Sequence, residues 1–146
     1  MKTNILLFIL LFLFIGCNKK NTNTYTGTPV PLLKTKWILT SIQNTTTSLI
    51  TNYPSNGPSE YIIFTDSLNI LNIKGSCNNC FSYYSIGNND SIVTKSGGIS
   101  TLISCENIQW ETDLLNSLGH MYKYKIYGND LSIYSNGTYN LNLVSQ

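Results

Sequence analysis

The C-terminal part of the chain alternates apolar and polar residues with period two, and short turn sequences interrupt the alternation. The alternating segments are residues 122–127, 131–134 and 139–144. Gly128-Asn129 joins the first two segments, and Asn136-Gly137 joins the last two. An Asn-Gly pair between alternating segments is the strongest short-range signal for a hairpin. We therefore predict a three-stranded antiparallel meander, because successive side chains of a strand point to opposite faces.

Further strands are predicted upstream of this meander. They are residues 36–42, 61–65, 68–73, 81–86 and 91–95. Short turn sequences join 61–65 to 68–73 in one hairpin and 81–86 to 91–95 in another. In the first of these strands Trp37, Leu39 and Ser41 fall on one face, and the polar stretch 44–58 that follows is predicted to be a loop.

One segment, about 106–118, has the spacing of a helix. Trp110, Leu114 and Leu118 recur every four residues, which places them on one helical face. Glu106 is expected in the first turn, and Gly119 is expected to cap the C-terminus. The apolar face of this helix must cover a sheet. The predicted fold class is therefore mostly β (α+β), an antiparallel sheet with one packed helix.

The amino end has the features of a lipoprotein signal peptide. Lys2 is followed by an uncharged apolar run at 5–15, which is too short to cross a bilayer as a helix. Gly16 and then Cys17 end the run, although Phe14 stands where such cleavage sites usually have leucine. We predict that residues 1–16 are removed and that Cys17 becomes the lipidated N-terminus.

Residues 17–33 are predicted to form a lipidated, flexible tether, because they are rich in Asn, Thr, Lys and Pro. More than one acyl chain on Cys17 would anchor the protein stably to a membrane. The predicted location is the cell envelope, facing the periplasm, with the outer membrane favoured over the inner. Residues 34–146 then suffice for a single domain.

Charge and chemistry exclude several function classes. The chain has nine basic residues, all lysines, and seven acidic ones, and loss of Lys2 leaves eight against seven, which argues against a nucleic-acid partner. The acidic residues are scattered and expected to be solvated, and the single histidine, His120, lies in no G-x-S-x-G context. We therefore predict no enzymatic activity, no catalytic residues and no cofactor.

Four groups of residues follow one another in a recognisable order along residues 34–144. They are Trp37-Ile38-Leu39; Gly75-Ser76-Cys77-Asn78 with Tyr84; Thr101-Leu102-Ile103-Ser104-Cys105; and Glu111 with Leu114, Leu118, Tyr124 and residues 128–131. Together they resemble the META domain, the HslJ-like domain of many bacterial envelope lipoproteins. The departures are an inserted Ser76, Ser82 in place of glycine, Ile103-Ser104 in place of Met-Ala, and an extra Cys80.

The resemblance implies that the sheet curls toward a barrel, and it adds no biochemical activity. Its motif residues in this chain are Trp37, Gly75, Asn78, Tyr84 and Thr101. The family pattern has a cysteine in each of two matching segments. It implies a disulfide between Cys77 and Cys105, and the alternative is Cys80 with Cys105; a disulfide is also the default for an oxidising compartment.

A different use of the same cysteines would be a zinc site. Cys77 and Cys80 have the spacing of a zinc knuckle, which Cys105 and His120 could complete as a Cys3His site. Export to a thiol-oxidising space makes this the least favoured hypothesis. A redox CxxC is also disfavoured, since it would lie between strands rather than at a helix N-terminus.

The favoured function is a membrane-anchored, non-enzymatic module with a structural or stress-related role, or one that binds an unknown protein partner. The alternative is a carrier of a small hydrophobic ligand, with a lipocalin-like open barrel end. A wide apolar cavity between the strands would favour the carrier, whereas a filled interior would favour the interaction module.

Overall fold

The predicted strands and helix form one curled sheet and one helix. The computed structural model describes residues 28–101 and 103–146. The predicted signal peptide and Cys17 lie outside the described residues. The elements are β1 (Lys36–Asn44), β2 (Ile50–Asn52), β3 (Tyr61–Phe64), β4 (Ile70–Lys74), β5 (Asn79–Ile86), β6 (Ile92–Ser100), α1 (Ile108–Gly119), β7 (Met121–Tyr127), β8 (Asp130–Ser135) and β9 (Tyr139–Ser145).

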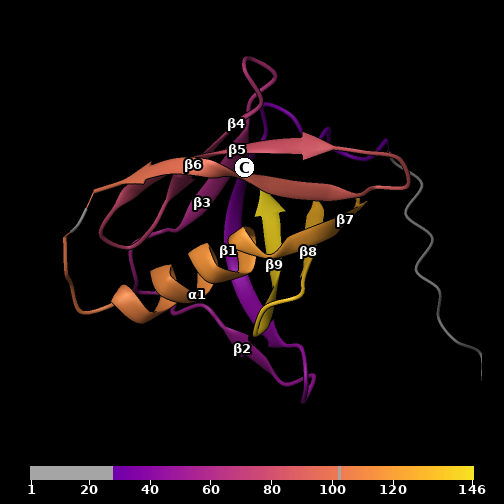
Figure 1. Ribbon diagram of the computed structural model, residues 1–146. Helices are drawn as coiled ribbons and strands as arrows, with labels where there is room; N and C mark the ends of the chain where they lie inside the picture. Colours follow the sequence, from indigo (N-terminus) through magenta and orange to yellow (C-terminus); the bar gives the residue numbers. More distant parts are fainter. Residues whose placement is uncertain (1–27, 102) are drawn as a thin grey trace, which may run out of the picture.

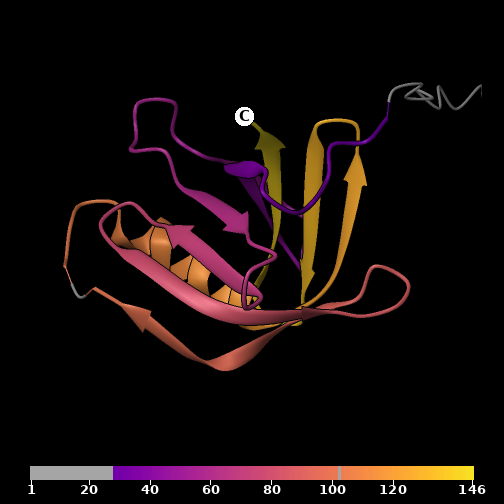
Figure 2. The ribbon, with the colours of Figure 1, turned by 90° about the horizontal axis from the view of Figure 1, so that it is seen from above.

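The named strands pair antiparallel in the order β6-β5-β4-β3-β1-β9-β8-β7, with the short β2 added beside β1. The two ends of this order approach each other, so the sheet nearly closes into a barrel (Figures 1 and 2). A bridge joins Ser91 to Lys123, and the N–H of Tyr124 donates to the carbonyl of Asp90 at 2.9 Å. The mostly β fold class and the barrel-like curvature are therefore confirmed.

The prediction of a loop over 44–58 missed strand β2. All three of its residues are exposed, so it has no burial pattern that a sequence could reveal. Its pairing with β1, from Ser41 opposite Asn52 to Gln43 opposite Ile50, comes from the hairpin between them. Strand propensity alone does not mark such an exposed ribbon.

Helix α1 begins two residues later than predicted and packs against β6, β8 and β9 (Figure 1). Glu106 therefore precedes the helix, and the acidic residue of the first turn is Glu111. Gly119 is the last helical residue rather than the cap, which is His120 at φ −116°. The cap has no left-handed backbone, so it does not need glycine. Among the described residues no helix is long and apolar enough to span a bilayer.

The interior of the barrel is filled by large apolar side chains. Twelve of them are at most 2% exposed: Trp37, Ile62, Phe64, Leu71, Tyr84, Ile92, Leu114, Leu118, Leu131, Ile133, Leu141 and Leu143. Helix α1 supplies two of these side chains, and the strands supply the rest. Residues on alternate positions of β1, β8 and β9 point inward, as the period-two pattern requires.

The segment before β1, which the sequence assigned to the tether, belongs to the packed structure from Val30 onward. Leu32 is 7% exposed, and its carbonyl accepts the indole N–H of Trp37 at 3.1 Å. Leu33 bridges to Phe64, and the N–H of Val30 donates to the carbonyl of Gly128 at 3.2 Å. This segment therefore crosses the end of the barrel that carries the β7–β8 turn (Figure 2).

We expect Leu32→Ala to lower the free energy of unfolding by about 2–3 kcal/mol, because it leaves a cavity in the buried apolar core to which Leu32 belongs. The matched control is Leu68→Ala, since Leu68 is 76% exposed in the β3–β4 turn and should be nearly neutral. Urea unfolding followed by tryptophan fluorescence measures both variants. Equal unfolding midpoints for the two variants would contradict the assigned role of Leu32.

Candidate functional site

The polar motif residues meet where the β4–β5 loop lies against the first turn of α1. The carboxylate of Glu111 is 3% exposed and enters this loop from the helix. Its Oε2 accepts the backbone N–H groups of Cys77 and Asn78, both at 2.9 Å. Its Oε1 accepts the side-chain amide of Asn78 at 2.6 Å. A single carboxylate thus holds the loop through three hydrogen bonds.

Asn78 extends this network to the segment that follows β6. Its Nδ2 also donates to the carbonyl of Ile103 at 2.9 Å. Its Oδ1 accepts the N–H of Ile103 at 2.7 Å and the hydroxyl of Thr101 at 2.8 Å. The buried amide therefore makes all four hydrogen bonds available to it. Neither aspartate nor leucine could replace it without leaving buried groups unpaired.

Gly75 is glycine because the carboxylate of Glu111 occupies the space that a side chain would need. A Cβ placed on Gly75 would lie 2.5 Å from Cγ and 2.6 Å from Cδ of Glu111. Such contacts are far inside van der Waals distance. The close approach of Glu111 therefore explains why residue 75 is glycine.

The structure pairs Cys77 with Cys105 across the same two segments, with Cα atoms 6.0 Å apart. This is the first of the two pairings considered from the sequence. Cys80 remains a half-buried thiol in β5, where its Sγ lies 3.0 Å from the hydroxyl oxygen of Ser100. The disulfide and Asn78 therefore link the β4–β5 loop to residues 101–105 twice.

The four residues of the zinc hypothesis do not come together. His120 follows the C-terminus of α1, where its Nδ1 lies 2.9 Å from the carbonyl oxygen of Asn116. Cys105 precedes the other end of this twelve-residue helix, which is roughly 18 Å long at 1.5 Å per residue. Within the described ranges, no group of three or more His, Cys, Asp or Glu side chains could hold a metal.

A second buried carboxyl group, Glu60, was missed by the sequence analysis, which expected solvated acids. Glu60 is completely buried just before β3. Its Oε1 accepts both the N–H of Ser76, at 3.1 Å, and the hydroxyl of Ser76. Its Oε2 is buried without a hydrogen-bond partner among the described residues. No local sequence pattern marks this site, because Glu60 follows the polar 44–58 stretch and looks like a loop residue.

The two carboxyl groups have opposite pKa shifts. Burial raises the pKa of Glu60 to about 7, an effect that the Ser76 hydrogen bonds oppose and the negative charge of Glu111 increases. Burial also acts to raise the pKa of Glu111, but its hydrogen bonds from Cys77 and Asn78 outweigh that effect and lower it. At mildly acidic pH, Glu111 is therefore ionised while Glu60 is protonated.

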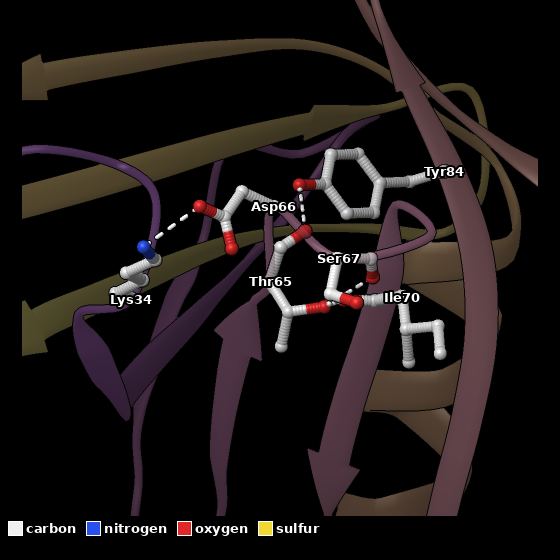
Figure 3. Close-up of polar contacts among 6 residues, drawn as sticks. All are labelled: Lys34, Thr65, Asp66, Ser67, Ile70 and Tyr84. Atoms are coloured by element: carbon white, nitrogen blue, oxygen red, sulfur yellow. Dashed lines mark hydrogen bonds and ion pairs between the residues drawn. The ribbon is translucent and has the colours of Figure 1, made fainter.

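Tyr84, another motif residue, stabilises the opposite part of the sheet (Figure 3). Its ring is 2% exposed and packs edge-on against Phe64, with centroids 5.0 Å apart. Its hydroxyl donates to the carbonyl of Thr65 at 2.7 Å, in the β3–β4 turn. The ion pair of Lys34 with Asp66, at 2.7 Å, links the same turn to the segment before β1. Tyr84 therefore has a packing role and does not line the Glu111 site.

The outside of the barrel has two shallow grooves that bear on function. One, of about 280 Å³, lies beside the site and is lined by Asn78, Ser100, Thr101, Ile103, Ser104, Ile108, Glu111 and Leu115. The other, of about 360 Å³, is lined by Tyr122, Lys123, Lys125 and Tyr134. The polar groups of Asn78 and Glu111 are already paired with each other, so the first groove presents mainly apolar surface.

This arrangement of curled sheet, covering helix and carboxylate-held loop defines a small β-barrel-like domain. The META domain family matches residues 30–146, and the chain belongs to this family. A solved structure, described as the NMR structure of a protein from Burkholderia xenovorans, has the same fold. It superposes with a TM-score of 0.63 at 16% sequence identity, over 87% of this chain and 97% of that one. No curated protein matches the chain.

We expect Gly75→Ala to lower the free energy of unfolding by about 2–4 kcal/mol, because it displaces Glu111 and unpairs the loop N–H groups. Gly119→Ala is the matched control, since nothing lies within 4 Å of a Cβ added there. That variant should be unchanged or more stable by up to about 1 kcal/mol. Chemical denaturation compares the two, and an unaffected Gly75→Ala would show that Glu111 does not fill the space.

The raised pKa of Glu60 predicts that stability falls as pH rises. The folded state favours the protonated acid, so this contribution is full below the ordinary pKa of 4.5 and is lost as pH passes through about 7. Between pH 5 and 8.5 the loss should be on the order of 2–3 kcal/mol, from the size of the pKa shift. Glu60→Gln should remove this dependence, whereas Glu106→Gln, at an exposed acid, should retain it. Thermal melts across this range test the prediction, and a flat wild-type profile would refute it.

Proposed function

We propose that this protein is a lipid-anchored module of the cell envelope that acts without catalysis, in a structural or stress-related role or by binding another protein. The observation that supports the proposal is that the polar groups of Asn78 and Glu111 are fully hydrogen-bonded within the fold. All four hydrogen-bonding positions of Asn78, and both carboxylate oxygens of Glu111, are used inside the fold. A catalytic site needs polar groups directed at a substrate position.

The cysteine usage supports an oxidising compartment. Cys77 and Cys105 lie at bonding distance on two segments that the Asn78 network already joins. Disulfides persist in exported proteins and are rare in the cytosol. This agrees with the predicted signal peptide and with lipidation of Cys17. A small domain gains resistance to unfolding from such a link, which suits a module that remains at the envelope.

The filled interior favours an interaction module over a carrier of small hydrophobic ligands. Trp37, Phe64 and Tyr84 occupy the space between the strands, and the carbonyl of the buried Leu32 accepts the indole N–H of Trp37. The helix covers the other end of the barrel (Figure 1). A carrier would need to displace several of these side chains, and their packing makes that costly. The outer faces are therefore the surfaces through which the protein would act.

Metabolic labelling with an alkyne palmitate in a bacterial host tests the anchor. We expect the wild-type protein to be labelled and to fractionate with membranes, and Cys17→Ser to be unlabelled. Cys80→Ser is the matched control, because it removes a different cysteine, a thiol outside the disulfide. It should be labelled like the wild type. Labelling of Cys17→Ser at the wild-type level would rule out the proposed anchor.

A further inference from the structure

The outer face of β7 and β8 carries an aromatic and basic groove that the fold does not use. Tyr122, Lys123, Lys125 and Tyr134 line it. Lys123 pairs with Tyr134 across the two strands, and Lys125 lies two residues further along the same face. Two residues along a strand span roughly 7 Å, so the two ammonium groups flank one shallow surface. Tyr122 and both lysines are exposed.

Among the described residues, the lysines of this face take part in no ion pair. In the described ranges the ion pair found is that of Lys34 with Asp66, and neither Lys123 nor Lys125 takes part in one. Asp90 lies in the turn before β6 and Asp130 is the exposed first residue of β8, and neither acid lines the groove. Exposed lysines beside tyrosines match the chemistry of an anionic membrane surface, where the ring lies at the headgroup level and the ammonium contacts phosphate.

The start of the described chain lies beside the same strands. The N–H of Val30 donates to the carbonyl of Gly128, so the described chain begins beside the β7–β8 turn (Figure 2). Residues 18–29 lie between Val30 and the predicted anchor at Cys17. Even fully extended, twelve residues reach at most roughly 43 Å, about the thickness of one bilayer. The membrane is therefore within reach of the β7–β8 face.

We propose that the outer face of β7 and β8 lies on the anionic phospholipid headgroups of the membrane that holds Cys17. This inference rests on the proposed lipid anchor. Each lysine near such a surface gives about a five-fold preference for anionic over neutral lipid. Two lysines alone bind weakly. For a tethered domain, however, the contact is intramolecular, and the high effective concentration makes a weak surface sufficient to orient the barrel.

Lysine footprinting on the full lipidated protein tests this orientation. The protein is reconstituted into vesicles of phosphatidylcholine, or of phosphatidylcholine with 30% phosphatidylglycerol, and treated with a neutral acetylating reagent. Mass spectrometry then gives the rate at each lysine. We expect acetylation of Lys123 and Lys125 to slow by about five-fold or more in the anionic vesicles. The rate at Lys74, on β4, should be the same in both.

A charge-matched pair of variants provides the second measurement. In Lys123→Gln/Lys125→Gln, the slowing of hydrogen exchange that anionic vesicles cause in residues 121–127 should disappear. In Lys34→Gln/Lys74→Gln, which has the same net charge, it should remain. Equal acetylation rates of Lys123 and Lys125 in the two lipids, or equal protection of residues 121–127 in the two double variants, would overturn the proposal alone. A purified wild-type protein whose intact mass shows no acyl chains would overturn the anchor and the proposal together.

Discussion

The buried carboxylate of Glu111 is the interaction on which the rest of the site depends. An ionised group can remain buried only when several donors replace its water, and the N–H groups of Cys77 and Asn78 with the Asn78 amide do so. Its position excludes any side chain at residue 75. Asn78 then transmits the constraint to the segment after β6, where the disulfide to Cys105 adds a covalent link.

The two ends of the barrel are covered by different parts of the chain. Helix α1 packs over one end through Leu114 and Leu118. At the other end Leu32 covers Trp37 and accepts its indole N–H, so the largest buried side chain has no unpaired donor. Among the described residues, large apolar side chains therefore fill the interior between the strands. In the proposed interaction role, a partner would meet exposed strands, loops or the helix surface.

The sequence predicted most of the strands because their hydrophobic periodicity is local. The three C-terminal strands and the hairpins of β3 with β4 and of β5 with β6 follow directly from alternation and turn residues. Strand β2 was missed, since its exposed residues carry no such pattern. The helix start was placed too early because Asn107 makes no side-chain cap bond that would mark it. Gly119 likewise proved to be helical and not a left-handed cap.

By itself, the sequence determined the fold class, the family resemblance and the two pairings open to Cys105. Only the tertiary structure decided which cysteine approaches it and where the buried charges lie. Glu60 shows the reason most clearly. Its burial, its contact with Ser76 and its proximity to Glu111 come from chain segments far apart in sequence. Buried apolar residues recur with a regular period along the sequence, so the sequence reveals them. A buried acid has no such pattern. The free-energy cost of burying its carboxyl group is offset by hydrogen-bonding partners that only folding brings together.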